Sequence, residues 1–250
     1  MISTLNFKNL NKKFVKNKPF DHVIIDNFWS EDVANELLLE ISDMPQNKMV
    51  TRYLSPLENK IAIPHWDLFK KTTYSAFNYL NSDFISNLQK ISGIDNLMPD
   101  IGLHGGGLHF HPTNGILNMH KDYSIHPKLG TMRKLNLIIY MNPEWKEEWN
   151  GQLEFWSHDE KNNLPDEKIK SIMPIFNRAV LFDVSQNGWH GLPIHTKQPD
   201  HIYRQSMAVY YMINPTKNIE QRPKALFAPR AEQKNDKSIV KLIQKRAGLI

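Results

Sequence analysis

The first third of the chain has apolar residues at the spacing typical of helices. A short apolar run at 21–26 predicts a strand, and Ser30 then stands where a helix N-cap is expected. Apolar residues recur at helical intervals over 33–41, and residues 67–80 and 82–91 predict two further helices. We therefore expect this part of the chain to be mainly helical.

From residue 103 onward the pattern changes to short β-branched and aromatic runs separated by Gly, Pro, Asn and Asp. These runs cover residues 103–111, 115–120, 134–141, 152–156, 172–175, 179–184 and 206–213. Short strands at this density, without helices between them, predict an antiparallel sandwich or barrel. Residues 236–247 have the pattern of a basic amphipathic helix. We predict a domain over 21–213, with its β core at about 103–213, a basic extension over 1–20 and a basic tail and helix over 214–250.

The composition narrows the chemistry that is open to the chain. Its longest apolar run, Met207 to Ile213, is far shorter than the roughly 18 residues of a membrane span. Cysteine is absent, which excludes disulfides, thiolate metal sites and cysteine nucleophiles, whereas there are 11 histidines. A metal would have to be held by imidazole and carboxylate groups. The first twenty residues have no apolar core of a signal peptide, so we expect a cytoplasmic protein.

The net charge of +5 is unevenly distributed along the chain. Residues 1–20 carry five lysines and no acid, and residues 214–250 carry nine basic and three acidic residues, which leaves residues 21–213 net acidic. Basic ends of this kind are usually solvated tails, so nucleic-acid binding is not expected. Attraction for an anionic co-substrate would have to come locally, from a metal and a nearby arginine.

One constellation of residues carries metal chemistry. His120 and Asp122 lie two residues apart at the end of a predicted strand, so both side chains point to the same face. His190 follows a later strand, and Arg204 opens the last one. Two histidines and one carboxylate on one face are the ligands of non-haem Fe(II) oxygenases. A nearby arginine suits a dicarboxylate co-substrate, because its guanidinium binds a carboxylate in bidentate fashion.

A second His-x-Asp pair, His65 and Asp67, forms a rival set with His120 and with Arg133 downstream. The segment between Asp67 and His120 is largely helical in our prediction, and it would not align these ligands as neighbouring strands do. Asp67 also has a structural use as the cap of the helix that follows it. We favour the set of His120, Asp122 and His190.

The order of the motifs resembles that of the 2-oxoglutarate- and Fe(II)-dependent dioxygenases, specifically the prolyl 4-hydroxylase-like branch. The matching segments are residues 118–122, 133–145, 151–155, 178–182, 189–191 and 204–211, and the 21–41 opening is similar to the family's N-terminal strand and helix. The resemblance implies an α+β fold with a double-stranded β-helix (jelly-roll, cupin-like) core, N-terminal supporting helices and a C-terminal basic helix.

The resemblance also implies the site. Fe(II) would be bound by His120, Asp122 and His190, and Arg204 and Tyr140 would bind the distal carboxylate of 2-oxoglutarate. O₂ would be the second co-substrate, with ascorbate as reductant, and the reaction would release succinate and CO₂. Arg204 lies a few residues later than the family arginine, which makes Lys197 a fallback. Phe110 stands where some prolyl hydroxylases have a further co-substrate tyrosine.

The substrate implied by this branch is a prolyl residue in a peptide or protein. The same chemistry on a small molecule or a sugar is the alternative, and a cupin-like metal-dependent isomerase or a non-catalytic binding module is an alternative of a different class. Candidate substrate or outer contacts are Arg133, Trp189, His109 and His111. Two loops, 51–65 with Arg52 and Tyr53 and 143–151, are expected to carry specificity.

Overall fold

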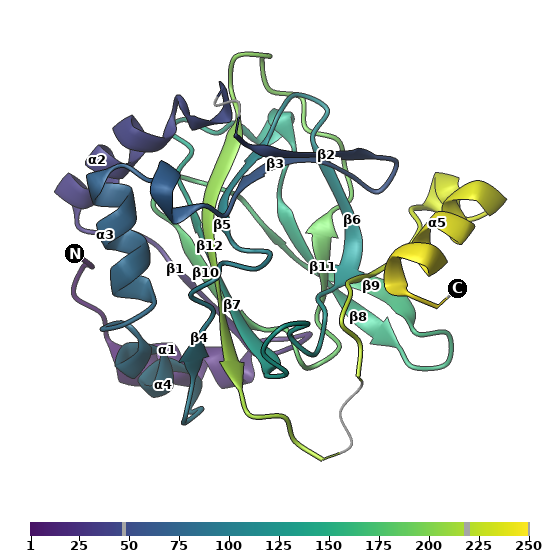
Figure 1. Ribbon diagram of the computed structural model, residues 1–250, viewed down its shortest axis with the longest axis horizontal. Helices are drawn as coiled ribbons and strands as arrows, with labels where there is room; N and C mark the ends of the chain where they lie inside the picture. Colours follow the sequence, from purple (N-terminus) through teal and green to yellow (C-terminus); the bar gives the residue numbers. More distant parts are fainter. Residues whose placement is uncertain (47–48, 218–220, 250) are drawn as a thin grey trace.

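The computed structural model describes residues 1–46, 49–217 and 221–249 (Figure 1). The α-helices are α1 (Phe7–Lys16), α2 (Glu31–Ile41), α3 (Lys71–Leu80), α4 (Ile85–Ser92) and α5 (Lys237–Ala247), with short 3-10 turns at Met44–Gln46, Trp66–Leu68, Glu147–Trp149 and Ala231–Gln233. The strands are β1 (His22–Ile25), β2 (Thr51–Ser55), β3 (Glu58–Ile63), β4 (Met98–Pro99), β5 (Gly107–His111), β6 (Ile116–Lys121), β7 (Met132–Tyr140), β8 (Leu153–Asp159), β9 (Leu164–Ile172), β10 (Ala179–Asp183), β11 (Trp189–Leu192), β12 (Arg204–Ile213) and β13 (Leu226–Phe227).

The strands of the described residues form one antiparallel sheet that curls around a cavity. Its order is β1-β10-β7-β12-β5-β3-β6-β11-β8-β9, with β2 on β3, β4 on β12 and β13 on β6. Residues of β5, β7 and β12 line the same cavity as residues of β6, β8 and β11, so the two halves of the sheet face each other across it (Figure 1). The predicted double-stranded β-helix core with supporting helices is confirmed.

The two-residue period of the strands separates the core from the cavity. On β7, Leu135, Leu137 and Ile139 are buried in the main hydrophobic core, while Asn136, Ile138 and Tyr140 line the cavity. On β12 the same alternation places residues 207, 209 and 211 in the core and residues 204, 206, 208 and 210 at the cavity. The site is therefore built from the strand positions that face away from the hydrophobic core.

Helices α1 to α4 cover the core side of the sheet, and α5 lies at the opposite side of the molecule (Figure 1). Leu10 and Phe14 of α1 are buried in the main core, so this lysine-rich segment is not the solvated tail that its charge suggested. The C-terminal basic helix is present as α5, in which Ile243 is buried against Phe227 and Leu57. None of the helices in the described residues is long and apolar enough to cross a membrane.

Two local predictions for the front third are wrong. Residues 51–63, expected as part of a loop, form the β2–β3 hairpin, and β3 joins the two halves of the sheet by pairing with β5 and β6. Asp67 does not cap the following helix, because it lies in the 3-10 turn before it. The first amides of α3 are instead capped by Glu40 of α2, which accepts bonds from the Thr72 and Thr73 amides at 2.9 and 2.6 Å.

Candidate metal and co-substrate site

Three predicted ligand side chains meet where β6 and β11 pair. His190 lies opposite His120 in the strand register, and their ring centroids are 4.3 Å apart. The two strands approach closely because Gly191 has no side chain, and a Cβ there would lie 2.7 Å from the Leu117 carbonyl oxygen. His120, Asp122 and His190 are all buried, and their possible ligand atoms lie within 4.8 Å of one another.

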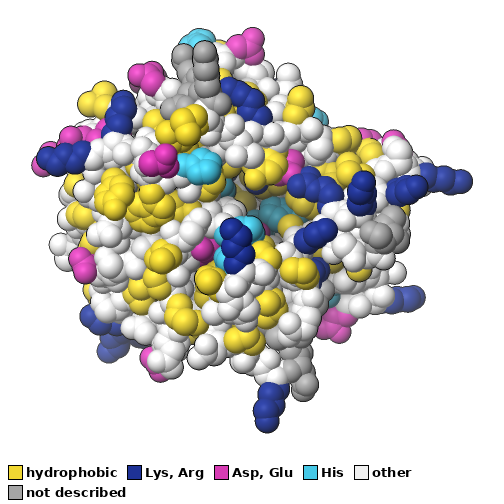
Figure 2. Space-filling view, in the orientation of Figure 1, with side chains coloured by type: hydrophobic (Ala, Val, Ile, Leu, Met, Phe, Trp, Pro, Cys, Tyr) yellow, Lys and Arg dark blue, Asp and Glu magenta, His cyan; other side chains and the backbone are white. Residues whose placement is uncertain are grey.

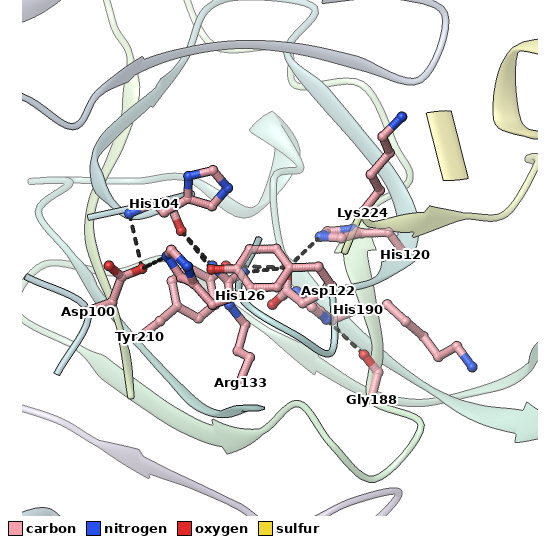
Figure 3. Close-up of polar contacts among 12 residues, drawn as sticks. Asp100, His104, His120, Asp122, His126, Arg133, Gly188, His190, Tyr210 and Lys224 are labelled. Atoms are coloured by element: carbon pink, nitrogen blue, oxygen red, sulfur yellow. Dashed lines mark hydrogen bonds and ion pairs between the residues drawn. The ribbon is translucent and has the colours of Figure 1, made fainter. Parts of the chain in front are cut away.

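Backbone carbonyls orient both imidazoles. Nδ1 of His120 is 3.0 Å from the Asn118 oxygen. Nδ1 of His190 is 2.8 Å from the Gly188 oxygen, a contact shown in Figure 3. Each Nε2 therefore faces Asp122, at 3.8 Å from Oδ1 for His120 and 3.8 Å from Oδ2 for His190. These separations are too long for hydrogen bonds, and Asp122 Oδ2 is buried without a hydrogen-bond partner among the described residues. Two such nitrogens and a carboxylate oxygen, unsatisfied by one another, fit a metal ion.

Arg133 and Tyr210 contact the other oxygen of Asp122. Arg133 Nη1 lies 3.5 Å from Oδ1, and the Tyr210 hydroxyl donates to the same oxygen at 3.4 Å. The Arg133 guanidinium is stacked between the rings of Tyr123 and Tyr210, 3.4 Å from each centroid, and its Nη2 donates to the His104 carbonyl (Figure 3). Arg133 is thus a buried neighbour of a proposed ligand.

The electrostatics of the cluster favour metal binding at neutral pH. Burial, together with the neighbouring His190, lowers the pKa of His120 to about 3, so its imidazole is neutral and has a free lone pair. Burial is the largest influence on Asp122 and would raise its pKa, but the Arg133 guanidinium, the two neighbouring histidines and the Tyr210 hydrogen bond together outweigh it, so the pKa lies below its ordinary value and the carboxylate is charged. Neutral imidazole and ionised carboxylate are the forms that bind metals.

Arg204 and Tyr140 lie next to each other on the cavity wall. The guanidinium carbon of Arg204 is 4.9 Å from the Tyr140 ring centroid, and its Nε donates to the Gly151 carbonyl at 2.6 Å. Both side chains are buried, the Tyr140 hydroxyl has no hydrogen-bond partner, and no carboxylate of the described residues forms an ion pair with Arg204. A buried guanidinium without an ion pair, next to a hydroxyl without a hydrogen-bond partner, fits an incoming carboxylate.

On β5 the alternation of the strand decides which residues reach the cavity. His109 and His111 line it, whereas Phe110 is buried in the main core and packs edge-on against Tyr203. His111, cross-strand partner of Arg204, is buried with neither ring nitrogen hydrogen-bonded. Phe110 therefore does not occupy a co-substrate position, because a one-residue step reverses the face of a strand.

Other sequence candidates are not brought to the cavity. His65 and Asp67 are exposed, outside the metal cluster, and Lys197 is exposed away from the cavity. Trp189 faces the opposite side of β11 from His190, where it packs with Met119 and Ala228 and donates to Nδ1 of His158 at 3.0 Å.

The cavity has a volume of about 790 Å³, and several of its residues were not predicted as site residues. The Tyr210 position follows from Arg204 by the two-residue period of β12, a signal that was available in the sequence. Phe227, Lys224 and Lys245 come from the basic C-terminal segment, and no spacing in the sequence connects them with the metal ligands. The sequence predicts that a metal and Arg204 alone attract an anionic co-substrate. Lys224 and Lys245 change this prediction, because they also line the cavity.

Comparison with known proteins finds similarity to one family over the β core. The family model described as the 2OG-Fe(II) oxygenase superfamily matches residues 106–212. A prolyl 3-hydroxylase of Mus musculus, OGFOD1, is 28% identical over 178 residues, which cover 69% of this chain and 29% of the mouse protein. The chain thus spans less than a third of the length of this relative.

Solved structures with the same fold include proteins with different molecules bound. A prolyl hydroxylase from Trichoplax adhaerens, in complex with a hypoxia inducible factor peptide fragment, aligns with a TM-score of 0.56 at 18% identity, covering 82% of this chain and 90% of that one. HygX of Streptomyces hygroscopicus, with nickel, 2-oxoglutarate and hygromycin B bound, aligns with a TM-score of 0.55 at 10% identity, covering 81% and 86%. At these identities the likeness shows the fold.

Proposed function

We propose, from the match of residues 106–212 to the model of the 2OG-Fe(II) oxygenase superfamily, that the protein hydroxylates an unactivated C–H bond of a prolyl residue in a peptide or protein. The observation that carries the proposal is the cluster of His120, Asp122 and His190 in one cavity with Tyr140 and with Arg204, which has no ion-pair partner among the described residues. A metal site alone would serve many activities. The adjoining carboxylate-binding pair specifies a co-substrate.

In this proposal Nε2 of His120, Nε2 of His190 and the free oxygen of Asp122 hold Fe(II). The fixed Nδ1 contacts keep both rings in one orientation, and Arg133 contacts the other oxygen of the Asp122 carboxylate, Oδ1. Arg204 and Tyr140 bind the distal carboxylate of 2-oxoglutarate, which leaves its keto acid end to reach the metal.

When bound, iron supplies the activation of O₂ that organic side chains lack. The overall reaction takes one oxygen atom of O₂ into the hydroxyl group and the other into succinate, as 2-oxoglutarate loses CO₂. The chain itself orients both substrates and excludes water, since Leu117, Ile138, Leu153 and Leu192 line the cavity as apolar walls. Ascorbate is proposed as the reductant that keeps the iron in its Fe(II) form.

The choice of a prolyl substrate is supported by the mouse prolyl 3-hydroxylase and by the peptide-bound Trichoplax enzyme. The structure of HygX with hygromycin B bound supports a small molecule or sugar as the second candidate for the same chemistry. Both candidates use one metal and co-substrate arrangement, and they differ in the residues that surround the mouth of the cavity.

The direct test is co-substrate turnover. Purified protein with Fe(II), ascorbate and 2-oxoglutarate is expected to release succinate slowly without a prime substrate, and faster with a suitable prolyl peptide. Mass spectrometry of the peptide then identifies the hydroxylated residue. An isomerase or a binding module would bind metal without consuming 2-oxoglutarate, so the absence of both 2-oxoglutarate binding and succinate release would contradict the enzyme proposal.

A further inference from the structure

The C-terminal segment, residues 221–249, forms one wall of the cavity at the level of the metal ligands. Its strand β13 pairs with β6, so that Phe227 lies opposite His120 in the register and Leu226 opposite Lys121. The Phe227 ring stacks on the His120 imidazole with centroids 5.3 Å apart and an interplanar angle of 24°. A segment about a hundred residues beyond the His-x-Asp motif thus contacts the first ligand of that motif.

A buried amide anchors this segment to β6. The Asn118 side chain is fully buried, and its Nδ2 donates to the Ala228 carbonyl at 3.0 Å and to Gln233 Oε1 at 2.7 Å. Arg230 donates to Asn118 Oδ1 and, at 3.2 Å, to the Pro56 carbonyl. Since each buried polar atom of the Asn118 amide finds its partner in the C-terminal segment, this contact fixes the segment in one position.

An ion pair anchors α5 to the strand β3 across the cavity mouth. Arg246 Nη2 lies 2.5 Å from Oε1 of Glu58, whose side chain is only 3% exposed, and the Arg246 guanidinium is 4.9 Å from the Phe227 ring centroid. Lys60 is 3.4 Å from the other Glu58 oxygen. Glu58 therefore neutralises at most one of the two cations that contact it.

Further cations at the mouth have no acidic partner in the described residues. Lys224, just before β13, and Lys245 of α5 are exposed, line the cavity and form no ion pair with any described side chain. Glu58 and Asp122 are the acids among the lining residues, and both are engaged by arginine. Figure 2 shows the hollow with histidine side chains inside it and Lys and Arg side chains along its right side.

Resting on the proposed function, we propose that Lys60, Lys224 and Lys245 form an anion-recognition rim, and that the substrate is a peptide with acidic residues next to the target proline. The three lysines come from β3, from the segment before β13 and from α5, and all three line the cavity. Cations distributed in this way match several carboxylates of an extended peptide, whereas a single phosphate needs donors that converge on one point. Tyr53, 38% exposed at the same mouth, adds an aromatic surface for the peptide.

The test compares three prolyl peptides of equal length whose target is flanked by Glu, by Ala or by Lys. With the full chain loaded with Mn(II) and 2-oxoglutarate in the absence of O₂, the Glu-flanked peptide is expected to bind about tenfold more tightly than the Ala-flanked one at low salt. The Lys-flanked peptide should bind most weakly, and the differences should shrink as salt is added. In turnover with Fe(II) the preference should appear in KM with little change in kcat.

The variant Lys224→Glu/Lys245→Glu is expected to abolish or reverse this preference. The matched control is Lys237→Glu/Lys241→Glu, which changes the same charge on exposed residues of α5 that do not line the cavity. The control should bind the peptides as the wild type does, and it should keep the wild-type rate of succinate release without peptide.

The outcomes separate this inference from the proposed function. If the protein releases succinate but does not discriminate among the three peptides, the proposed oxygenase activity is supported and the proposed anion-recognition rim is contradicted. A raised KM for 2-oxoglutarate in Lys224→Glu/Lys245→Glu, with unchanged peptide binding, would assign the lysines to the co-substrate instead. Hydroxylation of a phosphorylated small molecule but none of the peptides would also overturn it. Absence of succinate release by the wild type would contradict the proposed function. Peptide binding to the Mn(II)-loaded protein would still test whether the rim recognises acidic peptides.

Discussion

The guanidinium of Arg133 lies against one oxygen of Asp122, 3.5 Å from Oδ1, and leaves the other oxygen buried without a hydrogen-bond partner. Because Arg133 is itself stacked between two tyrosine rings, its position is fixed before any metal binds. The carboxylate is therefore presented to the metal through one defined atom. Arg133 acts through Asp122, as a positioning residue.

Replacing Arg133 should weaken metal binding rather than remove it. We expect Arg133→Met to raise the Kd for Mn(II) or Fe(II) by roughly 10- to 100-fold, the usual effect of losing a partner of a metal ligand. Arg133→Lys should recover only part of this, since an ammonium group cannot stack between two rings. Anaerobic titration calorimetry measures the effect.

The control for this prediction is Arg178→Met. Arg178 pairs with the exposed Asp26, away from the cavity, at 2.6 Å. Its loss should leave the Kd for the metal unchanged. An Arg133→Met variant that unfolds at the wild-type temperature and binds metal with wild-type affinity would contradict the positioning role.

The choice between the two His-x-Asp motifs is tested by a pair of substitutions. His120→Ala should abolish metal binding, because it removes one of three converging ligands. His65→Ala should leave metal binding unchanged, since His65 is exposed and outside the cluster. Tight metal binding that survives the first substitution and is lost in the second would make the rival assignment correct.

Arg204 and Lys197 form a similar pair for the co-substrate. We expect Arg204→Met to raise the KM for 2-oxoglutarate by about 30-fold, corresponding to roughly 2 kcal/mol for a buried charge-assisted hydrogen bond. Lys197→Met should have no effect, because Lys197 is exposed and does not line the cavity. Succinate release at varied 2-oxoglutarate measures both. The opposite result would place the co-substrate against the segment that precedes β12.

The sequence predicts which side chains face the cavity, because the geometry of a strand determines which side chains share a face. His120 and Asp122, or Arg204 and Tyr210, need only the two-residue period and a strand that is long enough. The sequence does not predict contacts that depend on packing between elements far apart in the chain. The capping of α3 by Glu40 and the stacking of Phe227 on His120 depend on tertiary contacts that no local pattern encodes.

The C-terminal segment illustrates the same limit for charge. Its nine basic residues predict a solvated tail, because basic chain ends are usually solvated. The buried Asn118 amide and the Glu58 carboxylate hold part of this segment against the cavity, so some of its charge becomes part of the site. Neither partner differs in sequence from an ordinary polar residue of a strand.

Buried histidines in the cavity wall should make the metal-free protein sensitive to acid. Burial, with the nearby Arg204 guanidinium, holds the pKa of His111 well below its ordinary value of 6.5. In the unfolded chain the same imidazole takes up a proton as the pH falls through 6.5, while the folded state stays neutral. Below this pH the unfolded state binds more protons, so the free energy of unfolding falls by up to about 1.4 kcal/mol per pH unit for this residue.

His111→Leu is expected to make this pH dependence shallower. The measurement is urea unfolding of metal-free wild type and variant at pH 8 and pH 5. At pH 8 imidazole is neutral in both states, so the difference between the two proteins there reports packing alone. From pH 8 to pH 5 the free energy of unfolding should fall less in the variant than in the wild type, because the variant has lost one proton-binding group of the unfolded state. An equal gap at both values would show that His111 takes up its proton in the fold as easily as in the unfolded chain.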